Sequence, residues 1–292
     1  MDLGCFLTPY FPDTAEPAEN ADELLRRATR CAEAGYDYAE VGDHHVTKEG
    51  QFFQNFPTAG RLTGLFDHVA VLALLPLYEP LFVAEYLGTL GAFTDRLDLW
   101  CAVGGNESAF DAVGVPMDSR AGRFQESLTL LERLFTEDSV TFDGDYFSVE
   151  DVAVNPRANP RLCIGGLAKP AIERAGRLGD AWIGHPSEGL EALERKMAWH
   201  EDAGGDRVIA RRDALVLEDG DEARGRAQAL LEDGFRSWPT DAEWPIVGDV
   251  ADATAELARL RDLGVDEVVV GAMDHDHAVE TFRMVARSRN RL

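Results

Sequence analysis

The chain has 292 residues, 45% of them hydrophobic, and this length suits one α/β barrel as well as two smaller domains. Its formal net charge of −25, from 53 acidic and 28 basic side chains, argues against nucleic acid as a partner. The longest apolar stretch, 69–77, is too short to cross a bilayer and the N-terminus lacks the basic start of a signal peptide, so we expect a cytoplasmic protein without a membrane partner.

The strongly acidic composition is spread along the whole chain. Lysine occurs only at Lys48, Lys169 and Lys196, and arginine supplies the other basic side chains. Such a composition resembles that of proteins from organisms that accumulate molar salt, where the Debye length falls to about 3 Å and surface charge mainly maintains hydration. We therefore expect a halophilic source and attribute the acidity to habitat.

Short apolar runs alternate with longer amphipathic stretches along the chain, a pattern typical of repeated βα units with parallel strands. The helix predicted over 21–34 ends at Gly35, a residue favoured just beyond helix C-termini. Eight strands are predicted, approximately at 3–7, 36–41, 68–75, 97–103, 162–164, 181–183, 208–217 and 267–270. Eight such units favour one α/β domain over 1–292, a closed (β/α)8 barrel of the TIM type.

Two segments depart from this alternation and are predicted to be insertions, one after the fourth barrel unit and one after the seventh. The first, 138–156, has the pattern of a hairpin, because Asp143-Gly144-Asp145 lies between two short apolar runs. The second, 237–248, is rich in Trp and Pro and is predicted to be irregular.

The four cysteines, Cys5, Cys31, Cys101 and Cys163, lie far apart in the sequence without the spacing of a zinc site. Three of them fall inside apolar runs. We expect four free, buried thiols.

In a barrel of this type the active site lies at the carboxyl ends of the strands, so residues that directly follow each apolar run are the candidates. The candidates are Asp43, His44 and His45 after the second strand, Asn106 after the fourth, Gly165 and Gly166 after the fifth, His185 after the sixth, and Asp274 to His277 after the eighth. The adjacent histidines suit proton transfer, because an imidazole titrates near pH 6.5. The alternative is that one caps a loop while the other faces solvent, since neighbours on an extended segment point to opposite sides.

Two further candidates have competing interpretations. Gly165-Gly166, followed by a helix that begins near Lys169-Pro170, suits a phosphate, because backbone N–H groups are exposed there, but it also fits an ordinary tight turn. The Asp274 to His277 run resembles a set of metal ligands, yet in so acidic a chain we favour a solvated helix start and predict no metal site. Asp67-His68 precedes a strand, so we assign it to the N-terminal face of the barrel, where residues contribute to stability and not to catalysis.

Several motifs together resemble the bacterial luciferase-like flavin monooxygenases. The segment from Val41 to Gly50, with an acidic residue and two histidines, is similar to the strand-two motif of that family. The other matching segments are 4–9, 75–80, 83–85, 94–97, 113–114, Arg120, Glu126, 164–168 and 175–182. The resemblance covers nearly the whole chain, and the ordered set is more specific than any one motif.

The resemblance implies a barrel that holds a flavin or a deazaflavin at its C-terminal mouth. His44 would be the catalytic histidine, assisting proton transfer to or from a flavin peroxide or the reduced flavin, and Asp43 and His45 would shape its environment. A bulge or non-prolyl cis peptide near Val71-Leu72 would support the ring. The phosphate would bind at Gly165, Gly166, Leu167 and Lys169, and Asn106 and His185 are further cofactor-binding candidates.

The implied activity uses reduced FMN, delivered by a separate flavin reductase, with oxygen and a small organic substrate, and relatives usually form homodimers. The alternatives are hydride transfer with a deazaflavin and a flavin-binding protein without turnover. Two departures from the family matter: Val103 stands where luciferases place a basic residue for the flavin phosphate, and the reactive cysteine of some relatives aligns with Ala102, beside Cys101. Light emission is therefore not implied.

Overall fold

Eight parallel strands form the framework of the computed structural model, which describes residues 1–11 and 15–292. They are β1 (Asp2–Phe6), β3 (Tyr38–Val41), β5 (His68–Leu74), β6 (Arg96–Ala102), β9 (Arg161–Gly165), β10 (Ala181–Gly184), β11 (Val208–Val216) and β13 (Glu267–Ala272). Their order is β10-β9-β6-β5-β3-β1-β13-β11, and β10 also pairs with β11. This cyclic order of eight parallel strands confirms the predicted (β/α)8 barrel.

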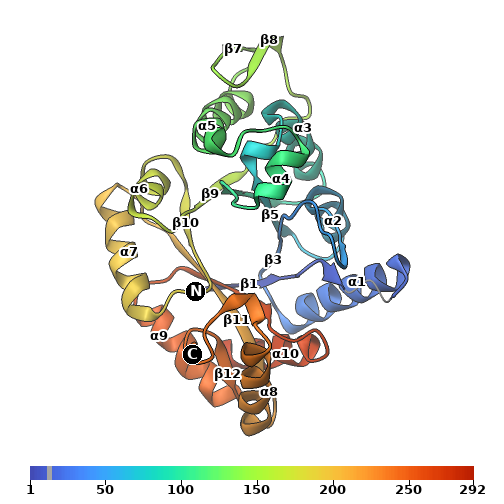
Figure 1. The fold of residues 1–292 in the computed structure, drawn as a ribbon, viewed down its shortest axis with the longest axis vertical. Coiled ribbons are helices and arrows are strands. Elements are labelled where there is room, and N and C mark those ends of the chain that lie inside the picture. The colour runs from blue at the N-terminus through green and yellow to red at the C-terminus, as the bar shows by residue number, and fades with distance from the viewer. Residues whose placement is uncertain (12–14) are drawn as a thin grey trace. The chain divides into compact units, whose positions relative to one another are not determined.

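Helices separate the strands, as the amphipathic stretches predicted (Figure 1). They are α1 (Pro17–Ala34), α2 (Asn55–Leu62), α3 (Pro80–Gly91), α4 (Glu107–Ala112), α5 (Arg120–Thr136), α6 (Lys169–Leu178), α7 (Leu190–Asp202), α8 (Gly220–Glu232), α9 (Val250–Asp262) and α10 (Ala278–Arg289), with 3-10 turns η1 (Leu75–Leu77), η2 (Met117–Ser119) and η3 (Phe235–Ser237). Helix α1 ends before Gly35, which has a positive φ of 88°, so the predicted helix end is confirmed.

The chain forms two compact units. Unit 1 comprises Met1–Thr8, Ala18–Glu40 and Cys163–Leu292, and unit 2 comprises Pro9–Pro17 and Val41–Leu162.

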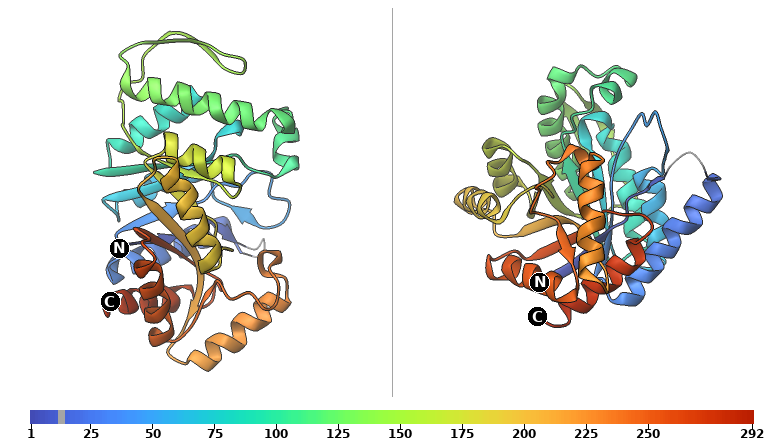
Figure 2. Two further views of the ribbon diagram at one scale, coloured as in Figure 1. Left: turned by 90° about the vertical axis from the view of Figure 1, so that its left-hand side faces the viewer. Right: turned by 60° about the horizontal axis from the view of Figure 1, so that its bottom comes forward.

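In unit 1, β1 pairs with β3 on one side and with β13 on the other. A Cβ atom at Gly4 would lie 2.6 Å from the Tyr38 ring, so this strand needs glycine where the ring packs. Helices α9 and α10 pack together, and α6 packs beside α7 (Figure 2). Helix α9 begins with a capping box in which the side chains of Asp249 and Asp252 each accept a hydrogen bond from the other residue's backbone N–H.

Strand β11 pairs with two different strands along the edge opposite β13. Its first residues, Val208 to Ala210, pair with β10, and Ala214 to Val216 pair with β12 (Ile246–Gly248). The prediction that 237–248 is irregular is therefore wrong for its last three residues. Three residues between Trp- and Pro-rich neighbours are too few for a recognisable strand period.

In unit 2, β5 and β6 pair in one unshifted register from His68 opposite Arg96 to Leu74 opposite Ala102. Two shorter pairs are β2 (Tyr10–Phe11) with β4 (Gln51–Phe52), and the hairpin of β7 (Val140–Asp143) with β8 (Ser148–Val152). The hairpin predicted within 138–156 is thus present. Its turn is held by the Glu126 carboxylate, which accepts hydrogen bonds from the backbone N–H groups of residues 145, 146 and 147 at 2.6–2.9 Å.

A buried ion cluster joins β5 and β6. The Asp98 carboxylate accepts a hydrogen bond from Arg161 Nε at 3.0 Å, and His68 Nε2 lies 3.0 Å from the other carboxylate oxygen. Burial raises the pKa of Asp98, but the hydrogen bonds from His68 and Arg161 outweigh it and hold that pKa below its ordinary value. This cluster gives His68 a structural role.

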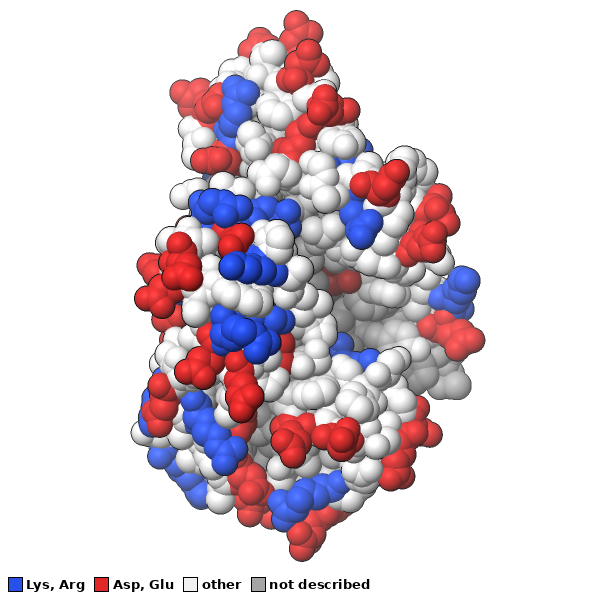
Figure 3. Space-filling model, turned by 60° about the vertical axis from the view of Figure 1, so that its left-hand side comes forward, with Lys and Arg blue, Asp and Glu red and all other residues white. Residues whose placement is uncertain are grey.

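The structure also shows where the cysteines and the charged side chains lie. All four cysteines are free and buried, which confirms the prediction. Acidic side chains are distributed over the face in Figure 3 with basic ones between them, in no single patch. Within the described ranges, no helix has both the length and the apolar character needed to cross a membrane.

Candidate functional site

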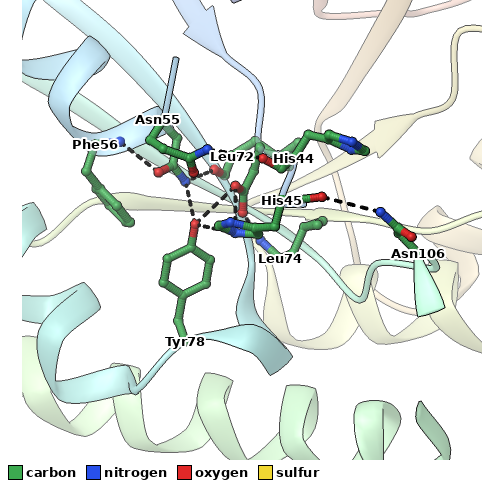
Figure 4. Close-up of polar contacts among 10 residues, drawn as sticks. His44, His45, Asn55, Phe56, Leu72, Leu74, Tyr78 and Asn106 are labelled. Carbon is green, nitrogen blue, oxygen red and sulfur yellow. Dashed lines mark hydrogen bonds and ion pairs between the residues drawn. The ribbon is translucent and has the colours of Figure 1, made fainter. Parts of the chain in front are cut away.

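A hydrogen-bonded network at the carboxyl end of β3, in unit 2, is centred on Asp43. Its side chain is fully buried and accepts hydrogen bonds from the Leu74 backbone N–H at 2.8 Å and the Tyr78 hydroxyl at 3.0 Å. His45 Nε2 lies 3.1 Å from Asp43 Oδ1 and 3.0 Å from the Tyr78 oxygen (Figure 4). The carboxylate thus fixes the loop after β3 to the end of β5.

The charge of Asp43 changes the proton affinity of His45. The hydrogen bond to Asp43 raises the pKa of His45, partial burial opposes this shift, and the negative charge of Asp43 adds to it. Burial, followed by the charge of Asp43, raises the pKa of the Tyr78 hydroxyl above its usual range, so this phenol remains protonated and donates to Asp43.

His44 lies outside this network. Its side chain is exposed, and its ring packs against Phe52 with the ring centroids 5.5 Å apart. Figure 4 shows the His44 ring pointing away from His45 and Tyr78, as expected for neighbours on an extended segment. Its imidazole makes no hydrogen bond to the described part of the chain, which leaves both ring nitrogens available to a bound molecule.

The backbone directly after the histidines is strained. Val46 has a φ of 57°, a left-handed conformation that β-branched residues rarely adopt. Such outliers cost on the order of 1–3 kcal/mol and tend to occur at functional sites. The strain supports a functional role for the preceding histidine pair.

The end of β5 differs from the expectation for Val71-Leu72. The cis peptide found among the described residues is Asn155-Pro156, so the predicted non-prolyl cis peptide is wrong. Against β6 the pairing is unshifted, and a bulge on the β3 side of β5 stays a prediction. Side chains hydrogen-bond the trans backbone at this strand end: Asn55 Nδ2 donates to the Leu72 carbonyl at 2.7 Å. Val71 is fully buried and Leu72 partly exposed, so of the two side chains only that of Leu72 reaches the surface.

Asn106, the residue before α4, approaches the histidine loop from β6. Its Nδ2 donates to the His45 carbonyl at 3.4 Å (Figure 4). The structure therefore brings Asp43, His45, Leu72 and Asn106 together in unit 2. Their proposed role in cofactor binding stays a prediction.

The contact between Asp43 and His45 predicts how the pKa of His45 responds to a substitution at Asp43. We expect Asp43→Asn to lower the pKa of His45, because an amide carries no negative charge. Since the raised pKa belongs to the folded protein, protonated His45 stabilises it below the ordinary pKa near 6.5, and this contribution is lost as pH rises through the raised value. NMR titration of the imidazole signals, assigned with His45→Gln, checks the shift; an unchanged His45 pKa in Asp43→Asn would contradict the described network.

The turn from β9 to α6, in unit 1, contains the predicted phosphate-binding residues. Gly165 ends β9, Leu167 is exposed, and α6 begins at Lys169. The Gly166 carbonyl accepts a hydrogen bond from Trp182 Nε1 at 3.1 Å, and a Cβ atom at Gly166 would come within 2.8 Å of Ala171. Glycine is therefore required where the turn passes the first turn of the helix.

Lys169 and His185 are also exposed in unit 1. Lys169 Nζ lies 3.7 Å from Glu173 and 5.7 Å from the Trp199 ring centroid. His185 Nδ1 accepts a hydrogen bond from the Ser187 backbone N–H at 3.3 Å. Burial, followed by the charges of Arg211, Arg236 and Lys196, lowers the pKa of His185 to about 4, so its imidazole is neutral at pH 7.

The Asp274 to His277 run has partners other than a metal. The Asp274 carboxylate pairs with Arg226 and lies 2.9 Å from His277 Nδ1, while His275 Nδ1 lies 3.1 Å from Arg27. No group of three or more potential metal ligands occurs in the described ranges. These contacts fit a helix start held by ion pairs.

The network also contains residues that the sequence analysis missed. Tyr78 and Asn55 are hydrogen-bonded to Asp43 or to each other, and neither follows a strand directly. Tyr78 lies within the family-like segment 75–80, which was the available signal. Asn55 opens a short helix and had no comparable signal.

Comparison with known proteins identifies the family. The model of the luciferase-like monooxygenase family matches residues 1–261. An F420-dependent glucose-6-phosphate dehydrogenase of Intrasporangium calvum is 26% identical, covering 88% of this chain and 90% of that protein. An FMNH2-dependent dimethylsulfone monooxygenase of Pseudomonas putida is 28% identical over 54% of this chain and 46% of that protein. The crystal structure of a monooxygenase from Streptomyces bottropensis has the same fold, with a TM-score of 0.85, 21% identity and coverage of 99% and 98%. This chain therefore belongs to the luciferase-like monooxygenase family.

Proposed function

We propose that this protein is an oxidoreductase that uses reduced FMN, supplied by a separate flavin reductase, and oxygen to oxidise a small organic substrate. Membership of the family supports the reaction class. The observation that carries the proposal is the exposed imidazole of His44, beside a loop that the buried Asp43 carboxylate holds in place. A proton-transfer group must be accessible to the reacting molecule and fixed in position.

The residues present fit a phosphate-bearing cofactor. The tight passage of Gly166 past Ala171 leaves no room for a side chain, and residues 167–170, which lead into α6, are exposed at a helix N-terminus, where a phosphate is favoured. Gly165, Gly166, Leu167 and Lys169 would hold the phosphate, and this set requires no basic residue at Val103. When bound, reduced FMN supplies the electrons for reaction with oxygen.

The chain's own residues would then handle protons and position. His44 would donate or accept a proton through whichever ring nitrogen faces the bound molecule. Asp43 would hold the loop by its bonds to Leu74 and Tyr78, and His45 would stabilise that arrangement. Asn106 would restrain the same loop through the His45 carbonyl.

A second candidate is hydride transfer with a reduced deazaflavin. The F420-dependent relative from Intrasporangium calvum matches this chain over most of both proteins, whereas the FMNH2-dependent relative matches about half of each. Val103 in place of a basic residue also removes one feature of the FMN enzymes. A third possibility, a flavin-binding protein without turnover, is disfavoured by the intact Asp43-His44-His45 segment.

The test is oxidation of the two reduced cofactors by the purified full-length protein. We expect reduced FMN to be consumed in the presence of oxygen and substrate candidates, faster than in buffer alone. Consumption of reduced F420 without oxygen, with a substrate candidate as the hydride acceptor, would replace the FMN proposal by the deazaflavin one. Binding of either cofactor with no catalysed oxidation across a broad substrate panel would favour the non-catalytic protein.

A further inference from the structure

A cluster of charged side chains lies on one face of the strands of unit 1. Phe6 on β1 is opposite Glu40 on β3 and Gly271 on β13, and Gly271 is opposite Asp213 on β11. Arg211 lies two residues before Asp213, so both side chains point to the same face of the sheet. Directly paired residues share a face, so Glu40, Arg211 and Asp213 face the same space.

Arg211 is the least satisfied cation of this cluster. Its side chain is 18% exposed, and its guanidinium lies 4.5 Å from the Phe6 ring centroid. The nearest acid is Glu40, with Nη2 and Oε2 3.7 Å apart, which is too long for a hydrogen bond. The guanidinium donates to no residue in the described part of the chain, so its five N–H donors remain for solvent or a ligand.

Glu40 is fully buried, and neither carboxyl oxygen has a hydrogen-bond partner among the described residues. Burial raises the pKa of Glu40 to about 7, against the opposing charges of Arg211 and Arg236. A purely structural ion pair would satisfy both groups, since a buried polar group without a partner costs about 1–3 kcal/mol. The pair as it stands is incomplete.

Arg236 brings a second guanidinium to the cluster from η3. Its Nε and Nη2 lie 2.8 Å and 3.1 Å from the two oxygens of Asp213, which leaves Nη1 without a partner in the described ranges. Arg236 and Ser237 have φ values of 50° and 56°. Two successive left-handed residues cost on the order of 1–3 kcal/mol each, so the loop holds Arg236 here at an energetic cost.

We propose that Arg211, Arg236 and His185 form a subsite that binds an anionic group of the substrate, such as a carboxylate, sulfonate or phosphate. A guanidinium fork matches the geometry of these oxyanions. His185 directly follows Gly184, which is opposite Ala210 on β11, so His185 lies beside Arg211 in the strand register and its imidazole is a further polar group for the same ligand. Glu40 and Asp213 act as positioning residues for the two arginines. The assignment of the bound anion to the substrate rests on the proposed function, whereas anion binding itself does not.

Anion binding at this subsite is coupled to protonation of Glu40. An anion on Arg211 disfavours a second negative charge beside it, so it favours the neutral acid and affinity increases as pH falls through about 7. The charged groups on the face of Glu40 are Arg211, Arg236 and Asp213. Burial also raises the pKa of Asp213, against the opposing charges of Arg236 and Arg211, so Glu40→Gln is the variant that assigns the pH dependence to Glu40.

The experiment is calorimetric titration of the full chain, without cofactor, with sulfate, whose charge is constant between pH 6 and 8. We expect sulfate to bind the wild-type protein more tightly at pH 6 than at pH 8, and Arg211→Gln to weaken binding at least tenfold. Arg236→Gln should weaken binding too, which covers the case that one variant fails to fold. Arg30→Gln is the matched control, because Arg30 is a 54% exposed arginine of the same unit and should leave binding unchanged. In Glu40→Gln the pH dependence should disappear.

Equal sulfate affinity in wild type, Arg211→Gln and Arg236→Gln, or no binding at all, would overturn the subsite. Titration with the cofactor distinguishes an anionic group of the substrate from the phosphate of the cofactor. Arg211→Gln should keep the wild-type affinity for the cofactor that the protein binds. If cofactor affinity falls by the same factor as sulfate affinity, the occupant is the cofactor phosphate and the substrate assignment is wrong. Sulfate binding is measured without cofactor. The titration therefore tests the anion subsite even if the proposed oxidoreductase function is wrong.

Discussion

Replacing His44 by alanine is expected to lower turnover by about 10²- to 10⁴-fold, the usual contribution of a positioned proton-transfer group. His44 is the exposed member of the histidine pair and makes no hydrogen bond to the described residues, so the loss would come from the reaction and not from the fold. Removal of an exposed side chain changes the free energy of unfolding by about 0.5 kcal/mol or less. Cofactor affinity should change little.

Steady-state rates and cofactor titrations of His44→Ala, measured beside His45→Ala, separate the two histidines. His45 is bonded to Asp43, so its removal should disturb the loop and affect both stability and rate. Full activity in His44→Ala, with loss of turnover in His45→Ala alone, would move the proton-transfer role to the Asp43–His45 pair. A parallel fall in kcat and in cofactor affinity in His44→Ala would assign His44 to binding.

Replacing Asp98 by alanine is expected to cost about 3–5 kcal/mol of unfolding free energy, because it leaves the buried His68 and the partly buried Arg161 without their shared carboxylate. The side chain of Asp98 is 3% exposed. Asp95, three residues earlier and exposed, is the matched control, and Asp95→Ala should change stability by about 0.5 kcal/mol or less.

The pH dependence of this loss has a defined sign. The pKa of Asp98 is lowered in the folded protein, so its stabilisation is present above the ordinary pKa near 3.9 and is lost as pH falls through the lowered value. Denaturant unfolding of wild type and Asp98→Ala should therefore give a constant difference at neutral pH that narrows below about pH 4. Equal losses for Asp98→Ala and Asp95→Ala would contradict a stabilising cluster.

The fold was largely predictable because the strands have distinct apolar runs and the helices have clear end signals. The end of α1 at Gly35 and the start of α3 at Pro80 follow directly from residue chemistry. Strand β12 was missed, because three residues carry no period, and so was its pairing with β11. Such a pairing depends on the course of the whole chain.

The site was predictable only in part. Asp43, His44 and His45 stand out because they directly follow a strand, and their opposite orientation follows from extended backbone. The partners of Asp43 were not predictable from position, because Tyr78 lies 35 residues away and Asn55 begins a helix. The expectation of a non-prolyl cis peptide near Val71-Leu72 came from the family resemblance and is wrong. In the structure the side chains of Asn55 and Asp43 hydrogen-bond the backbone at this strand end.

Glu40 and Arg211 show a different limit. Both lie in segments that read as apolar strands, where the sequence alone does not reveal whether a charged residue is buried or exposed. The burial of Glu40 and the lack of hydrogen-bond partners for its carboxyl oxygens follow only from the strand register of the structure.

The central claim is that this chain binds a flavin or deazaflavin cofactor, and equilibrium titration of the purified protein with FMN and with F420 tests it most directly. The account predicts saturable binding of one of the two, with one cofactor per chain. Failure of both cofactors to bind at concentrations far above those at which flavoenzymes are saturated would contradict it.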